Sequence, residues 1–83
     1  MYKKCLLKCS VLNENEEWND EQFCFDYIGE IATFIKYGNA YIKPENVRVK
    51  EIFVAKDKLN IDDFFKFFKI KIQNYIDKWK SKL

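Results

Sequence analysis

The feature that most constrains this chain is its C-terminal segment, residues 60–83, which has the pattern of one amphipathic helix. Apolar residues recur there at steps of three and four, the spacing that places side chains on one face of a helix. Asn60 is a good N-cap, and Asp62 and Asp63 follow in the first turn, where the helix dipole favours negative charge. The predicted apolar stripe is Ile61, Phe64, Phe65, Phe68, Ile72, Tyr75, Ile76, Trp79 and Leu83. Because such a helix buries one face, the rest of the chain has to supply the surface that it packs on.

Two large apolar residues of this segment, Phe67 and Ile70, do not belong to the stripe. On a helical wheel they fall roughly 120–180° away from it, on the side that is expected to face solvent. This predicts a second contact, either with another protein or with a second copy of the chain, which would give a homodimer through the C-terminal helix. The alternative is that the sheet wraps far enough around the helix to cover them. We expect no membrane contact, because the stripe is needed for the core.

Two segments have the alternation of β-strands. In residues 2–12 the odd-numbered positions include Cys5, Leu7 and Cys9 on one face. In residues 47–55 the apolar positions change face between Val49 and Ile52, which predicts a β-bulge near Lys50 and Glu51. The polar residues 13–21 are expected to form a loop.

Residues 22–37 fit two structures. As a helix, the segment would be capped by Asn19, with Gln22 completing a capping box, and it would end at Gly38. As a strand, it would be followed by a two-residue Gly-Asn turn that pairs Ile35 with Ile42. We favour the strand because the segment is rich in β-branched and aromatic residues. The helix stays the alternative, and the fold class does not depend on this choice.

These elements predict a single α+β domain over residues 1–83. Residues 1–59 would be mainly β and form a small, curved antiparallel sheet of four or five strands, barrel-like in shape. The long C-terminal helix, residues 60–83, would pack on that sheet. A chain of 83 residues has little surface to bury, but 18% of its residues are aromatic, and each large ring buries roughly 150–250 Å².

The chain contains no histidine and no known catalytic or nucleotide-binding motif, and two glycines do not make a phosphate-binding loop. Its cysteines are Cys5, Cys9 and Cys24, with no Cys-x-x-Cys pair, so we expect small buried hydrophobic side chains and no metal ligand. The sequence therefore predicts a non-enzymatic protein with no catalytic residue, no metal and no cofactor. The absence of a disulfide pattern and of a signal peptide favours the cytoplasm.

Charge is distributed unevenly along the chain. Residues 13–30 contain Glu14, Glu16, Glu17, Asp20, Glu21, Asp26 and Glu30 with no Lys or Arg. An acidic segment on an otherwise basic molecule can orient a charged partner. Together with the extra apolar groups of the C-terminal helix, it predicts a small protein-binding module. The predicted partner-binding residues are Glu14, Glu16, Glu17, Trp18, Asp20, Phe67 and Ile70.

Lysine outnumbers arginine fourteen to one, alongside much Ile, Asn, Phe and Tyr, as is typical of AT-rich coding sequence. This composition suggests a phage or mobile-element factor. On that hypothesis the module binds and inhibits a host or defence protein.

The alternative function is nucleic-acid binding. Residues 27–41, with their alternation and Gly29 and Gly38, resemble the strand–turn–strand of small RNA-binding barrels of the S1 or cold-shock type. Exposed aromatic rings flanked by basic groups can stack the bases of single strands. The candidate residues for this surface are Lys36, Tyr37, Tyr41, Lys43 and Arg48. With a single arginine in the chain, bidentate reading of guanine is nearly excluded, so binding would be weakly sequence-specific.

Overall fold

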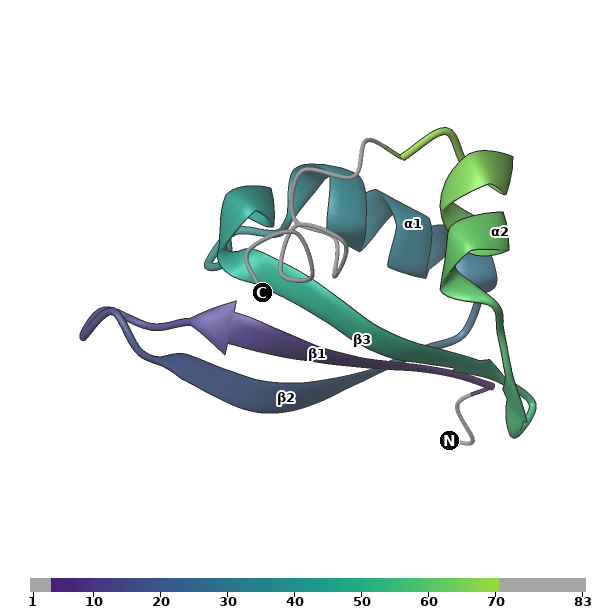
Figure 1. Ribbon diagram of the computed structural model, residues 1–83, viewed down its shortest axis with the longest axis horizontal. Coiled ribbons are helices and arrows are strands. Elements are labelled where there is room, and N and C mark those ends of the chain that lie inside the picture. The colour runs from purple at the N-terminus through teal and green to yellow at the C-terminus, as the bar shows by residue number, and fades with distance from the viewer. Residues whose placement is uncertain (1–3, 71–83) are drawn as a thin grey trace.

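The computed structural model describes residues 4–70. Four antiparallel strands, β1 (Cys5–Leu12), β2 (Trp18–Phe25), β3 (Val47–Val54) and β4 (Asp57–Lys58), form a sheet in the order β2–β1–β3–β4. The helices α1 (Ile28–Tyr37) and α2 (Ile61–Phe67) cover one face of this sheet, and a short 3₁₀ helix, η1 (Pro44–Asn46), precedes β3 (Figure 1). The predicted α+β class and the four-stranded antiparallel sheet are confirmed. The barrel-like shape is not found, because the sheet is open.

Strand β1 is central and pairs with β2 on one side and β3 on the other. Its residues Cys5, Leu7 and Cys9 are buried, so the predicted inward face of this strand is confirmed. The pairing with β3 shifts between Lys8 and Cys9: Lys8 lies opposite Glu51, whereas Cys9 lies opposite Val49. Lys50 is the extra residue, which confirms the bulge that the change of face predicted.

The favoured strand over residues 22–37 is correct for residues 22–25 and wrong for residues 28–37, where the alternative helix is correct. Strand β2 ends at Phe25, and α1 begins at Ile28. The Glu30 carboxylate accepts hydrogen bonds from the N–H groups of Asp26 and Tyr27, which caps the start of the helix. The predicted cap at Asn19 is wrong, since that residue lies inside β2, and residues 18–21 of the predicted loop are strand as well. Burial at helical spacing outweighs the β propensity of this segment, and its buried residues are Ile31, Ala32, Phe34 and Ile35.

Helix α1 ends at Gly38, as the helical alternative predicted. The N–H of Gly38 donates to the carbonyl of Phe34, and its backbone has a φ of 70°. The predicted Gly-Asn hairpin turn is therefore wrong, and Ile35 does not pair with Ile42 across a ladder. Instead, Asn39 braces the loop that follows, because its side-chain oxygen accepts hydrogen bonds from the N–H groups of Tyr41 and Ile42.

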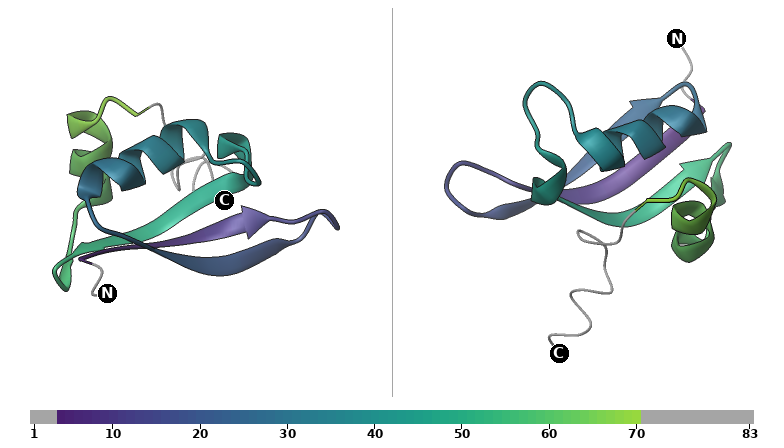
Figure 2. Two further views of the ribbon diagram at one scale, coloured as in Figure 1. Left: turned by 180° about the vertical axis from the view of Figure 1, so that it is seen from behind. Right: turned by 90° about the horizontal axis from the view of Figure 1, so that it is seen from above.

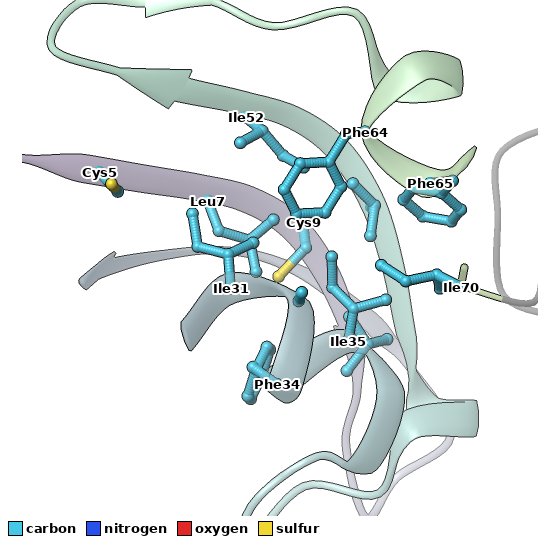
Figure 3. Packing of buried hydrophobic residues seen from close by; sticks show 13 residues of the cluster. Cys5, Leu7, Cys9, Ile31, Phe34, Ile35, Ile52, Phe64, Phe65 and Ile70 are labelled. Carbon is cyan, nitrogen blue, oxygen red and sulfur yellow. The ribbon is translucent and has the colours of Figure 1, made fainter. Parts of the chain in front are cut away.

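The core lies between the sheet and the two helices. Leu7, Cys9 and Ile52 of the sheet point toward Ile31 and Ile35 of α1 and toward Phe64 of α2 (Figure 3). The buried cluster consists of Cys5, Leu7, Cys9, Ile31, Ala32, Phe34, Ile35, Val47, Val49, Ile52, Phe64, Phe65 and Ile70.

The predicted C-terminal helix is confirmed at its start and differs at its end. The Asn60 side chain accepts a hydrogen bond from the N–H of Asp63, so the N-cap is correct. The helix stops at Phe67, and Lys69 adopts a φ of 56°, which does not continue an α-helix. The part of the prediction that concerns residues 71–83 lies outside the described residues.

The two glycines give a matched pair of stability tests. In Gly38→Ala, the new Cβ would lie 2.1 Å from the carbonyl oxygen of Ile42 at a positive φ, so we expect a loss of about 2–4 kcal/mol in the free energy of unfolding. In Gly29→Ala, the Cβ would meet nothing within 4 Å, and we expect a gain of about 0.5–1 kcal/mol because alanine favours the helix. Urea denaturation measures both, and changes of the same sign would contradict this account of the two sites.

Candidate functional site: a groove between β2 and α1

The predicted partner-binding residues do not form one surface. Glu14, Glu16 and Glu17 lie in the turn between β1 and β2, whereas Phe67 lies on α2 at the opposite end of the molecule (Figures 1 and 2). The ring of Phe67 is 79% exposed, in agreement with the sequence analysis, but Ile70 is only 8% exposed. The prediction that Ile70 faces solvent is wrong, because the chain leaves the helix after Phe67 and carries Ile70 into the core.

Trp18 and Asp20, the other two predicted partner-binding residues, lie on the face of the sheet that the helices leave uncovered. They alternate along β2 with residues that point toward α1, and they lie opposite Leu12 and Ser10 of β1. Both are therefore near the acidic turn in sequence but belong to a different surface.

The candidate residues for nucleic-acid binding are also divided. Lys36 and Tyr37 end α1, and Tyr41 and Lys43 lie in the loop that follows it. The rings of Tyr37 and Tyr41 are 71% and 93% exposed. Arg48 lies on the opposite face of the sheet, because its neighbours in β3, Val47 and Val49, are buried under the helices.

A groove of about 730 Å³ lies between β2 and α1. Its walls are mainly apolar, and its volume lies within the range of ordinary ligand-binding sites, roughly 300–1,000 Å³. The lining residues are Phe23, Cys24, Phe25, Tyr27, Gly29, Glu30, Thr33, Phe34, Gly38 and Asn39. The groove could not be expected from the sequence, because one of its walls is β2, which ends at Phe25, whereas the predicted strand continued to residue 37.

The aromatic wall of the groove is held by ring contacts between the sheet and the helix. The ring of Phe34 in α1 lies 5.1 Å from that of Phe23 and 6.1 Å from that of Phe25, measured between centroids. Phe34 is buried, whereas the two rings of β2 are only partly buried and therefore stay accessible from the groove. Tilted pairs of this kind stabilise the packing by about 0.5–1.5 kcal/mol each beyond the area that they bury.

Strand β2 forms the lower wall of the groove and is an edge strand of eight residues. The N–H of Asn13 donates to the carbonyl of Glu17 where the two strands leave the turn. The alternation of an antiparallel ladder then directs the backbone groups of Asp20, Gln22 and Cys24 away from β1, toward the free edge. An edge of this kind can pair with another strand.

Gly29 lines the groove, and the fold itself does not require a glycine at this position. It lies in the first turn of α1, its φ is not in the left-handed region, and a Cβ there would touch nothing within 4 Å. A glycine inside a helix costs about 0.5–1 kcal/mol relative to alanine. A backbone without a side chain lets another chain approach closely, so this residue favours an occupied groove. A glycine near the start of a segment that also fits a helical period is the sequence signal that points to the site.

The uncovered face of the sheet combines aromatic rings with charged groups. The Arg48 guanidinium lies 3.9 Å from the centre of the Trp18 ring, and the Lys8 ammonium lies 5.3 Å from that of Phe53. Lys50 donates to Asp20, and this hydrogen bond, with a second from Ser10, lowers the pKa of the Asp20 carboxyl.

Further along the same face, a hydrogen bond from Lys58 lowers the pKa of the Glu51 carboxyl. A second cavity of about 320 Å³ lies beside Phe53 and is bordered by Lys4, Lys8 and Lys56. The three lysines that border this cavity make this end of the face basic, although Lys8 also pairs with Glu51 at 3.8 Å.

The cysteines show no arrangement for catalysis or metal binding. Cys5 and Cys9 are buried free thiols, as predicted, but Cys24 is exposed on β2, so the prediction is wrong for that residue. Burial raises the pKa of Cys9 to about 12, and burial also raises the pKa of Cys5. Within residues 4–70, no three His, Cys, Asp or Glu side chains come together as metal ligands, and no helix is long and apolar enough to cross a membrane.

Comparison with protein-family models, curated proteins and solved structures gives no significant match to this chain.

The burial of the thiols predicts their reactivity. We expect a maleimide to modify Cys24 in the folded protein, whereas Cys5 and Cys9 react only after denaturation. Raising the pH to about 9 should not expose Cys9 to reaction, because its pKa of about 12 keeps the thiol protonated there. Mass spectrometry before and after adding urea counts the modified thiols, and Cys24→Ser is the control that should stay unmodified. Rapid modification of Cys9 in the folded protein would contradict the described core.

Proposed function

We propose that this protein is a protein-binding module whose docking surface is the groove between β2 and α1. The observation that supports this proposal best is the combination, at one place, of a mainly apolar groove of about 730 Å³ and the edge of an eight-residue strand that no other strand within residues 4–70 pairs with. Apolar walls bind side chains, and the strand edge offers hydrogen-bonding groups of the backbone. A polypeptide is the ligand that presents both kinds of group together.

The chemistry of the groove favours binding over catalysis. Its lining contains one carboxylate, that of Glu30, which already accepts two hydrogen bonds from the backbone at the start of α1. The lining thiol, Cys24, has no histidine to activate it, since the chain contains none. We therefore propose a non-enzymatic role.

Two finer hypotheses from the sequence stay predictions. Inhibition of a host or defence protein by a phage or mobile-element factor is motivated by composition, and a homodimer through α2 is motivated by the exposed ring of Phe67. In both hypotheses the turn that contains Glu14, Glu16 and Glu17 would present negative charge to the partner, at the end of the molecule opposite α2.

A bulky side chain at Gly29 tests the groove. We expect Gly29→Trp to weaken the binding of groove-directed ligands at least about ten-fold, because the indole would occupy the site, which corresponds to roughly 1.4 kcal/mol. Peptides selected from a displayed random library against the wild-type protein supply the ligands, and fluorescence anisotropy measures their affinity.

Gly29→Ala is the graded comparison: it should retain fold stability and weaken binding less than Gly29→Trp, because its methyl group fills little of the groove. Thermal unfolding of Gly29→Trp checks that the variant is folded. A library that yields no binding peptide, or peptides that bind Gly29→Trp as well as the wild type, would contradict the proposal.

A second candidate function is weakly specific binding of single-stranded nucleic acid, now on the uncovered face of the sheet. The observation that favours it is the pairing of rings with cationic groups, Arg48 over Trp18 and Lys8 over Phe53, beside Lys4 and Lys56. Bases can stack on such rings while lysines contact phosphates.

Oligonucleotide titration at about 50 mM salt tests this candidate, because phosphate contacts are strongest at low salt. We expect Trp18→Ala to lower the affinity about five-fold or more, as base–aromatic stacking contributes roughly 1–3 kcal/mol. Tyr41→Ala, on the far side of the sheet, is the control that should leave the affinity unchanged. The absence of binding at this salt concentration would exclude the candidate.

A further inference from the structure

We infer that the partner segment binds as an extended strand added to the free edge of β2, with a large apolar residue and a basic residue two positions apart on the side that faces α1. This inference rests on the proposed function and goes further by assigning the binding mode and the side-chain chemistry of the partner.

The backbone of β2 supplies the first step. Asp20, Gln22 and Cys24 direct their N–H and C=O groups away from β1, and no other strand of the described sheet lies beyond β2. Cys24 lines the groove, so the edge and the groove are continuous. A strand that pairs with these three residues would lie along the floor of the groove and in reach of α1.

The side chains of β2 supply the second step. Glu21, Phe23 and Phe25 alternate with the edge-directed residues and point toward the helix side of the sheet. Phe23 and Phe25 line the groove beside Phe34, and Glu21 is exposed just beyond them toward the acidic turn. On a strand added beside β2, an apolar residue would suit the position next to Phe23 and Phe25, and a basic residue would suit the position next to Glu21.

Electrostatics decides between a foreign segment and a second copy of this chain. Strand β2 contains Asp20 and Glu21 and no Lys or Arg, and the turn before it adds Glu14, Glu16 and Glu17. Pairing two copies of β2 would bring acidic edges together, which is unfavourable. A partner strand with Lys or Arg would instead be attracted along the same edge.

A designed pair of peptides tests this inference. The probe is the acetylated, amidated octapeptide Thr-Leu-Thr-Arg-Thr-Leu-Thr-Arg, which matches the length of β2 and places Leu and Arg on one face of a strand. The control, Leu-Arg-Thr-Thr-Leu-Arg-Thr-Thr, has the same composition but places them on opposite faces. We expect the probe to bind at least about ten-fold more tightly than the control, as measured by fluorescence anisotropy.

Backbone pairing is tested separately from side-chain contact. Alternate amides of a bound strand point toward β2, and the others point away from it. N-methylation of the odd-numbered amides of the probe and N-methylation of the even-numbered amides should therefore differ: one set should abolish binding and the other should be tolerated. Binding should slow hydrogen exchange at the N–H groups of Asp20, Gln22 and Cys24. Gln22→Pro removes an edge-directed N–H without removing a hydrogen bond to β1, and it should weaken binding at least five-fold, whereas Gln22→Ala should not.

Charge reversal tests the basic position. Glu21→Lys should weaken binding of the probe about two- to five-fold, and replacing Arg by Glu in the probe should restore it. Library-selected peptides could lose affinity for Gly29→Trp and yet leave hydrogen exchange at Asp20, Gln22 and Cys24 unchanged and tolerate N-methylation of either set of amides. That result would overturn binding as an added strand, while the proposed function would stand. If sedimentation shows a dimer of the free protein that Gln22→Pro dissociates, the edge is occupied by a second copy and the inference is overturned.

Discussion

The burial of one face of β1 under α1 and α2 is the interaction on which the rest of the structure depends. Strand β1 pairs with β2 and β3, so Leu7 and Cys9 lie at the centre of the sheet and point toward side chains of both helices (Figure 3). Each fully buried apolar side chain contributes roughly 1.5–3 kcal/mol, which is a large share of the stability of a domain this small. Within residues 4–70, the central strand is covered on one face only, which leaves the other face of the sheet open. In the same part of the chain β2 is an edge strand, so its outer backbone groups pair with no other strand.

The sequence determined β1, β3 and the start of α2 because each has a single clear periodicity. The bulge at Lys50 and the N-cap at Asn60 could be predicted for the same reason, since a change of apolar face and a capping residue are local signals. Residues 22–37 could not be assigned to one element, because they contain a strand end and a helix in succession. Their β-branched residues favour a strand, and only packing against β1 shows that Ile31 and Ile35 lie on a helix.

The candidate site was less predictable than the fold. A groove depends on which strand lies at the edge and which helix lies over it, and neither follows from local periodicity. The acidic character of residues 13–30 was visible in the sequence, but its place along β2 and the adjoining turn was not. Arg48 was grouped with Lys36, Tyr37 and Tyr41 because the residues are near in sequence, whereas the sheet places Arg48 on its opposite face.

The extra residue in β3 has a consequence for how the length of this strand can vary. Val47 and Val49 precede Lys50, Ile52 follows it, and all three apolar residues face the helices only because one position is unpaired. Removing Lys50 would place Glu51 directly after Val49, and their partners Lys8 and Cys9 are also adjacent in β1. The ladder would then become regular, with Val47, Val49 and Ile52 still on the buried face. Removing Phe53 instead, with the extra residue kept, would move Val54 from the buried face to the opposite one. The strand therefore tolerates the loss of one residue at the bulge and not beyond it.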